Sequence, residues 1–308
     1  MYAGASYCPV GKAGRPLFCT GDICPDNATT FATFSGAISD ISGYIAINEY
    51  MSNIVIAVRG SSDLHNWITN LRFLQTGCYW GSDCRVHEGF QQAYQDILND
   101  NFYESLRQAI EDYPSYNITV TGHSLGGAVA TLLGVYAREE FPDVGAIDIY
   151  TYGSPRVGNL PLLTYVHNQP GGREYRLTHF DDVFPRLPPM SYLGYAHSSA
   201  EYWLKWGPAD RVDYVPGMIA KCWGFLNGDC NAAGWYPGLR SHLYYLVAIS
   251  HCGGARSRLS FGGLPIDDAP TWNATVMDKD TIERLEMFAE MDQQYAAAMS
   301  TISDPEYA

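Results

Sequence analysis

Short apolar runs alternate with amphipathic stretches along most of the chain. Residues 43–49 and 53–60 are rich in isoleucine and valine and predict the two strands of a hairpin. Three further short strands are predicted over residues 117–121, over the run that ends at Gly153, and over residues 173–179. Runs of this length are typical of buried strands.

Two other stretches have the spacing of helices. Residues 89–113 predict one long amphipathic helix. After Ser124, apolar side chains such as Ala128, Leu132 and Tyr136 recur every three or four positions and predict a second helix. Because helices alternate with short buried strands, we expect an α/β fold with a mostly parallel central sheet and flanking helices.

The alternation stops in the last part of the chain. Residues 253–270 are rich in glycine, proline and small side chains and predict a linker. An amphipathic stripe then predicts a last helix from about residue 280 to residue 299. We therefore expect a main domain over residues 1–252, followed by a linker and helical extension over residues 253–308 that packs on or near it.

Composition narrows the class of protein. The chain has 308 residues, 46% of them hydrophobic, which is enough for a sizeable core. A net charge of −14 argues against a nucleic-acid partner and against electrostatic docking on anionic lipid. The sequence contains no apolar run long enough for a transmembrane segment.

Cysteine usage points to an oxidising compartment. The eight cysteines are even in number and include no C-x-x-C motif, which disfavours zinc-ribbon and thioredoxin-like sites. The first ten residues lack an apolar signal core, so either the chain is cytosolic or a targeting segment has been removed. Four disulfides would favour the second alternative and a secreted, extracellular protein. Three glycosylation sequons, at Asn27, Asn117 and Asn273, point the same way.

The strongest chemical motif is G-x-S-x-G over residues 122–126. It lies between a predicted strand and a predicted helix, which is the context of the nucleophile elbow in α/β-hydrolases. The sharp turn would expose the hydroxyl of Ser124, and the helix that follows would direct its N-terminal N–H groups toward developing negative charge.

A serine nucleophile needs a base and an acid, and in this fold they follow it in the order acid, then histidine. Asp181 and Asp182 lie directly after the predicted strand 173–179, whereas Asp148 lies inside a strand. Spacing leaves three histidines open as the base. We favour His242 among them because it opens an apolar segment that predicts a helix; the other two are His197 and His251.

Several motifs taken together resemble the class 3 lipases of filamentous fungi, a family of secreted triacylglycerol lipases with feruloyl esterases as cousins. The resemblance extends from about Tyr7 to Cys252. The chain continues beyond it in a C-terminal extension, and in this respect it is closest to the Fusarium-like branch. The resemblance implies an α/β-hydrolase fold and a catalytic triad of Ser124, Asp182 and His242. The motifs that carry it are "VRGSSDLHNWITNLRF", "VTGHSLGGAVA", "YGSPRVGN", "RLTHFDDVFPRLPP" and "HSSAEYW".

The oxyanion hole and the cysteine pairs follow from the same resemblance. The backbone N–H of Leu125, the residue after the nucleophile, is one expected donor, and the resemblance supplies Ser61 as the other. No metal and no organic cofactor is expected. The resemblance implies the disulfides Cys8–Cys252, Cys19–Cys24 and Cys78–Cys84, which leaves Cys222–Cys230 as the fourth.

A lid is expected directly after Ser61. Four apolar residues fall at i, i+3, i+4 and i+7 of a short segment and predict an amphipathic helix; they are Leu64, Trp67, Ile68 and Leu71. The resemblance also implies a lid here, although an ordinary surface helix would have the same spacing. Feruloyl esterases are more polar in this stretch and lack the tryptophan.

These expectations define one preferred function and two alternatives. The preferred function is a secreted, monomeric lipase that hydrolyses acylglycerols at a lipid–water interface through an acyl-enzyme intermediate. The first alternative is a soluble carboxylesterase or a phospholipid or galactolipid acyl hydrolase of the same fold. The second is a non-catalytic binding protein on this scaffold. The extension is expected either to dock on the main domain or to lie near the acyl-binding mouth.

Overall fold

The computed structural model describes most of the chain. The lid residues expected from the sequence, Leu64, Trp67, Ile68 and Leu71, lie outside the described parts. The described residues are 1–9, 11–19, 21–61, 72–234, 238–252, 260–261, 264–265 and 279–300.

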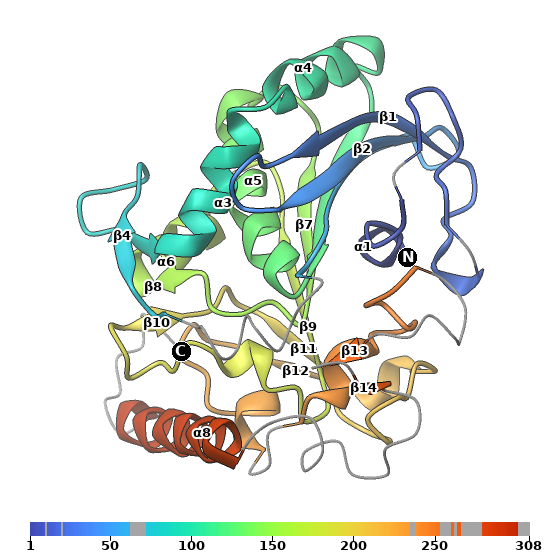
Figure 1. The fold of residues 1–308 in the computed structure, drawn as a ribbon. Helices are drawn as coiled ribbons and strands as arrows, with labels where there is room; N and C mark the ends of the chain where they lie inside the picture. The colour runs from blue at the N-terminus through green and yellow to red at the C-terminus, as the bar shows by residue number, and fades with distance from the viewer. Residues whose placement is uncertain are drawn as a thin grey trace.

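An eight-stranded sheet runs through the centre of the molecule (Figure 1). Its spatial order is β1-β2-β3-β6-β7-β9-β11-β12. The strands from β3 to β11 are parallel, whereas the first three strands form an antiparallel meander and β12 is antiparallel to β11. The sheet is therefore mixed. Its strands are β1 Ala28–Ser35, β2 Ser42–Asn48, β3 Asn53–Val58, β6 Asn117–His123, β7 Ile147–Tyr152, β9 Glu174–His179, β11 Glu201–Leu204 and β12 Ile219–Cys222.

Helices cover both faces of this sheet. Figure 1 shows α3, α5 and α6 on one side and the short α1 on the other. The helices are α1 Tyr2–Ala5, α3 Glu88–Leu98, α4 Phe102–Asp112, α5 Leu125–Glu140, α6 Leu160–Asn168 and α8 Lys279–Ser300, with 3₁₀ turns η1 Gly21–Ile23, η2 Phe184–Arg186, η3 Pro216–Met218, η4 Cys230–Ala233 and η5 Arg240–Leu243. A smaller sheet orders its strands β10-β8-β5-β4, and β13 pairs with β14. These strands are β4 Gln75–Gly77, β5 Arg85–His87, β8 Gly158–Asn159, β10 Tyr195–Ala196, β13 Ser260–Phe261 and β14 Leu264–Pro265.

The alternation of side chains along the central strands explains this layering. Ile45 and Ile47 of β2 point into the main core with α3 and α5, whereas Tyr44 and Ala46 point to the opposite face and pack toward Tyr2 of α1. Successive residues of a strand face opposite sides, so apolar residues at both sets of positions require cover on both faces.

The predicted long helix over residues 89–113 is wrong as one element. It divides into α3 and α4 at the sequence Asn99-Asp100-Asn101. Asparagine and aspartate favour turns because their side chains compete for backbone hydrogen bonds. Here the Asp100 carboxylate accepts the N–H of Ser35 in β1 at 2.9 Å, so the break also ties the helix pair to the sheet.

The predicted helix that opens at His242 is also wrong. Only the 3₁₀ turn η5 forms there, and the chain then folds back so that Tyr244 pairs with Ala248. Leu246 has a φ of 58° at the tip of this bend. The apolar residues are buried by a compact turn, and a run of aromatic and β-branched residues carries no helix period strong enough to oppose it.

Four disulfides join the eight cysteines: the three pairs that the resemblance implies and the fourth pair that remains, Cys222–Cys230. Cys8–Cys252 links positions 244 residues apart, and so it connects the N-terminal segment to the end of the region that resembles the lipases. The other three close short loops of the chain.

Helix α8 agrees within one residue at each end with the helix expected from residue 280 to 299. It lies against the body of the protein (Figure 1). Its Asp292 is fully buried and accepts the N–H of Met190 at 2.6 Å. The same carboxylate forms an ion pair with Arg156 at 2.6 Å. The ring of Phe288 packs edge-on against Phe73, with 5.2 Å between centroids.

Candidate active site

Ser124 occupies a strained turn between the end of β6 and the start of α5. Its φ of 57° and ψ of −132° are unusual for a residue with a side chain. The turn is possible because Gly122 and Gly126 flank it. A Cβ on Gly122 would lie 2.2 Å from the carbonyl oxygen of Gly126, and a Cβ on Gly126 would lie 2.4 Å from that of Val58.

Asp182 and His242 come together from separate loops. Asp182 follows β9, His242 lies in η5, and a bridge between Asp182 and Gly238 aligns the two segments. His242 Nδ1 and Asp182 Oδ2 are 2.8 Å apart, and both side chains are fully buried. His242 Nε2 is buried and has no hydrogen-bond partner within the described part of the chain.

Burial and hydrogen bonds act in opposite directions on the Asp182 carboxylate. Burial raises the pKa of Asp182 to about 7, although the hydroxyl of Tyr245 and the N–H of Phe184 both lower it. These groups donate to Oδ2 at 2.5 Å and to Oδ1 at 2.9 Å. Burial lowers the pKa of His242, so its ring is neutral near pH 7 and can accept a proton.

The His242 ring is held between other side chains. Phe184 stacks on one side with 3.6 Å between ring centroids, and the ring of His123 lies 4.5 Å away. His123 Nε2 contacts the carbonyl oxygen of His242 at 2.7 Å, and its Nδ1 contacts the hydroxyl of Tyr7 at 2.8 Å. These contacts restrict the ring to one orientation.

Two glycines pack directly on the site. A Cβ on Gly153, at the end of β7, would lie 2.9 Å from both the Asp182 carboxylate and the His242 ring. A Cβ on Gly60 would lie 3.2 Å from the Cβ of Ser124. The second contact places the backbone before Ser61 beside the nucleophile elbow.

The alternatives from the sequence lie elsewhere or make other contacts. Asp181 accepts a hydrogen bond from Ser241, and its backbone oxygen accepts the N–H of Gly238. His197 Nε2 lies 2.6 Å from the carbonyl oxygen of Pro185. Leu125 is the first residue of α5, as expected for an oxyanion donor.

Four contributors were missed by the sequence reasoning: Tyr245, Phe184, His123 and Gly153. Phe184 and Tyr245 lie two and three residues after Asp182 and His242, so their proximity in sequence was a usable signal. His123 immediately precedes Ser124, and Gly153 ends a predicted strand. None of the four belongs to a pattern that specifies its contacts.

The described residues lack two other classes of site. They hold no group of three histidine, cysteine, aspartate or glutamate side chains arranged to bind a metal ion. Their helices include none that is both long and apolar enough to cross a bilayer.

Comparison with known proteins identifies relatives over nearly the whole chain. A family model described as lipase (class 3) matches residues 55–192. The secreted mono- and diacylglycerol lipase 1 of Fusarium solani is 37% identical, over 97% of this chain and 86% of that protein. The secreted mono- and diacylglycerol lipase A of Penicillium camembertii is 36% identical, over 81% of this chain and 83% of that protein.

Solved structures give the same result for the fold. The mono- and diacylglycerol lipase of Aspergillus oryzae superimposes with a TM-score of 0.74 at 31% identity, over 82% of this chain and 95% of that one. The expected α/β-hydrolase fold, the ester-hydrolase class and the secreted location are thereby confirmed. The chain belongs to the class 3 lipase family, among the secreted fungal lipases.

Proposed function

We propose that the protein hydrolyses carboxylic esters of acylglycerols, mono- and diacylglycerols included, with Ser124, His242 and Asp182 as the catalytic triad. The observation that carries the proposal is the buried Asp182–His242 pair, in which His242 Nε2 has no hydrogen-bond partner among the described residues. A neutral imidazole with one nitrogen bound to a carboxylate and the other unused is ready to act as a general base. The named activities of the Fusarium and Penicillium relatives support the substrate class.

The proposed reaction proceeds in two halves. Ser124 Oγ attacks the ester carbonyl while His242 Nε2 takes its proton, and His242 then returns that proton to the departing alcohol. Water, activated by the same nitrogen, releases the fatty acid from the acyl-enzyme. Asp182 keeps the ring oriented and stabilises the imidazolium in both halves.

Developing negative charge on the carbonyl oxygen needs fixed donors. We assign this role to the backbone N–H of Leu125, at the positive end of α5, and to Ser61, whose neighbour Gly60 packs against Ser124. Removal of one such donor typically lowers turnover by roughly 10²–10³.

Two further parts of the proposal concern surrounding segments. The lid, with Leu64, Trp67, Ile68 and Leu71, would cover the site in water and turn its apolar face to lipid at an interface. The chain would divide into a catalytic domain over residues 1–252 and an extension over residues 253–308 that packs on it. The contacts of α8 with Met190, Arg156 and Phe73 support this division.

The test is the rate of tributyrin hydrolysis across its solubility limit, with Ser124→Ala as the control. An abrupt rise in rate when droplets form, absent from the control, is expected for a lipase with a lid. Smooth saturation below the limit, with no rise, would indicate a soluble esterase instead. Equal rates for the wild type and the control would contradict the assignment of the nucleophile.

A further inference from the structure

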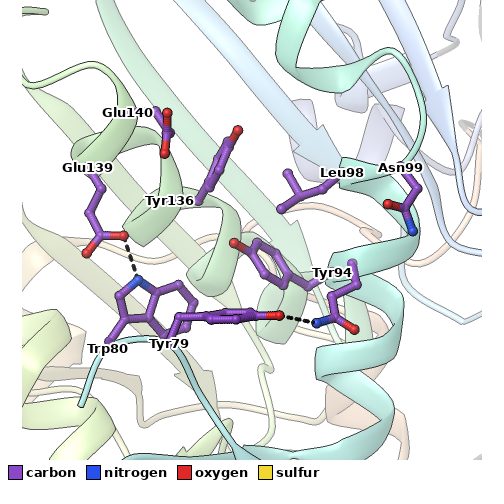
Figure 2. A pocket seen from close by; sticks show the side chains of 9 residues that line it. Tyr79, Trp80, Tyr94, Leu98, Asn99, Tyr136, Glu139 and Glu140 are labelled. Atoms are coloured by element: carbon purple, nitrogen blue, oxygen red, sulfur yellow. Dashed lines mark hydrogen bonds between the residues drawn. The ribbon is translucent and has the colours of Figure 1, made fainter.

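A cavity of about 570 Å³ opens far from the triad, between the loop after β4 and the last turns of α3 and α5 (Figure 2). This volume lies within the usual range of small-molecule sites, roughly 300–1,000 Å³. Ser124 and Glu139 are 15 positions apart along α5, which corresponds to about 22 Å of helix. The cavity is therefore separate from the ester-hydrolysing site. Its principal lining residues are Tyr79, Trp80, Tyr94, Tyr136, Glu139 and Glu140.

Four of the nine residues that line the cavity are aromatic. The rings of Trp80 and Tyr94 are 5.9 Å apart, and those of Tyr94 and Tyr136 are 6.2 Å apart and nearly perpendicular. Tyr79, which is 77% exposed, stands at the opening and accepts a hydrogen bond from Gln95 at 3.2 Å. Figure 2 shows these rings around one space, an arrangement that presents several π surfaces to a single ligand.

The loop that carries two of these rings is held in place. Tyr79 and Trp80 lie inside the loop closed by the Cys78–Cys84 disulfide. The indole N–H of Trp80 donates to Glu139 at 2.7 Å, and Tyr165 donates to the other oxygen of the same carboxylate. A preorganised wall reduces the ordering cost of binding a ligand.

Charge in the cavity has one sign. Glu139 and Glu140 are the charged residues of the lining, which contains neither lysine nor arginine. Arg138, the nearest basic residue in sequence, is buried on the other side of α5 in an ion pair with Glu174. The cavity also lies at the C-terminal ends of α3 and α5, where the helix dipole is negative.

We propose that this cavity binds a small organic cation, of the quaternary ammonium or methylated amine class. Such a cation is attracted to the faces of tryptophan and tyrosine, and it also gains from two carboxylates and two negative helix ends. The ligand can be a free amine or the headgroup of a choline lipid, since the recognised group is the same. A neutral sugar would also stack on the rings, but it would gain nothing from the negative charge.

The direct test is calorimetric titration of the full-length protein with choline and with its neutral isostere 3,3-dimethyl-1-butanol. Choline is expected to bind roughly tenfold more tightly, and its affinity is expected to fall as salt increases. Equal affinity for the two probes would overturn the proposal. So would the absence of heat with choline when maltose binds, because that result would identify a sugar site.

Variants locate the binding. The double substitution Glu139→Gln and Glu140→Gln keeps both shapes and removes both charges, so choline affinity should fall at least fivefold; wild-type affinity would overturn the proposal. The matched control replaces the exposed Glu49 and Glu290 with glutamine and should bind choline normally. Trp80→Phe keeps an aromatic ring, so it should still bind choline, but more weakly than the wild type. It tests Trp80 without the risk that the larger truncation, Trp80→Ala, prevents folding.

A third arm separates the two sources of the cation. In the Ser124→Ala background, sedimentation with phosphatidylcholine vesicles is compared before and after the double glutamine substitution. A loss of vesicle binding together with choline binding assigns the site to a lipid headgroup. Loss of choline binding alone assigns it to a free amine. Hydrolysis of tributyrin should be unchanged by the double substitution in the active enzyme.

Discussion

At the residue scale, the buried Asp182 carboxylate depends on its donors to remain charged. Burial alone favours the protonated form, and a protonated Asp182 would not stabilise an imidazolium on His242. Tyr245 donates to the same oxygen that contacts His242 Nδ1. Tyr245 is therefore a positioning residue whose hydroxyl also lowers the pKa of Asp182 and so favours the ionised acid.

Tyr245→Phe tests this role. Loss of one hydrogen bond of about 1 kcal/mol should lower kcat roughly fivefold. Because the Tyr245 hydroxyl lowers the pKa of Asp182, its removal should raise that pKa further above its value of about 7. Activity requires the ionised acid, so the acidic limb of the kcat–pH profile should move to higher pH. The measurement is hydrolysis of a soluble p-nitrophenyl ester between pH 5 and pH 9.

Tyr175→Phe is the matched control, because Tyr175 stacks on Tyr150 in the sheet, away from the triad. It should leave both kcat and the profile unchanged. A Tyr245→Phe profile that coincides with that of the wild type would show that the hydroxyl does not tune the acid.

Individual residues also show how much of the candidate site could be predicted from the sequence. Ser124 was predicted as the nucleophile from its own motif, because G-x-S-x-G between a strand and a helix describes a local geometry. The resemblance decided for Asp182 over Asp181 and for His242, which spacing had only favoured over two other histidines. The position of Tyr245, three residues after His242, was a signal for the site, but its partner could not be predicted because its hydrogen bond to Asp182 joins two loops whose meeting depends on the whole fold.

At the scale of elements, the close approach of β6 and α5 depends on glycine at position 122, which has no side chain. Gly122→Ala would place a Cβ 2.2 Å from the backbone oxygen of Gly126. The contact is with backbone, so no flexible side chain can move aside to relieve it. Overpacking of this kind should lower the free energy of unfolding by about 2–3 kcal/mol. Urea unfolding followed by far-UV circular dichroism measures it.

The matched control is Gly77→Ala in β4, where an added Cβ would have no neighbour within 4 Å among the residues that the structure describes. Its urea midpoint should stay close to that of the wild type. If Gly122→Ala were as stable as Gly77→Ala, the close approach of β6 and α5 would be wrong.

Helix α3 begins at a cap that His87 can supply only while its ring is neutral. His87 Nδ1 accepts the N–H of Gly89 at 3.1 Å, and burial lowers the pKa of His87 to about 4. In the unfolded chain a histidine takes up its proton near pH 6.5. As the pH falls from about 6.5 to 4, the unfolded state binds more protons than the folded state, so stability declines by about 3 kcal/mol from this group.

His87→Asn keeps a capping acceptor but removes the titration. The variant should be less stable at pH 8, because the stacking of His87 on Phe90 is lost. Its further loss of stability between pH 8 and pH 4.5 should be smaller than that of the wild type by about 2–3 kcal/mol. Other groups titrate in both proteins and cancel in the difference. Urea midpoints at the two pH values test this, and an equal loss in both proteins would contradict the burial of a neutral ring.

Element boundaries were harder to predict than element types. Strands β2, β3, β6 and β9 were expected within a residue or two of where they lie. Each is a short run of residues with strong strand preference, so its position can be read from the local sequence alone. The break between α3 and α4 was missed because the hydrophobic period continues across it. A side chain of the break, Asp100, bonds to β1, a strand that the sequence pattern did not predict.

At the scale of the whole molecule, the extension is attached by a buried charge pair. Arg156 and Asp292 are 2% and 0% exposed, and Arg156 also donates to the carbonyl oxygens of Arg186 and Pro188. A charge can be buried here only because its partner is present. Arg156 belongs to the "YGSPRVGN" motif, so the contact joins the family core to helix α8.

Asp292→Ala would leave the Arg156 guanidinium buried without its counter-charge, which typically costs about 3–5 kcal/mol. If α8 unfolds together with the body, the urea midpoint should fall in one transition with an unchanged slope. Glu290→Ala, an exposed site two residues earlier on the same helix, should change the free energy of unfolding by less than about 0.5 kcal/mol. A smaller slope for Asp292→Ala would show that α8 leaves the body first and alone. An unchanged midpoint and slope would mean that the ion pair does not hold the extension, and the division into a catalytic domain and a docked helix would then have to rest on the contact between Phe288 and Phe73.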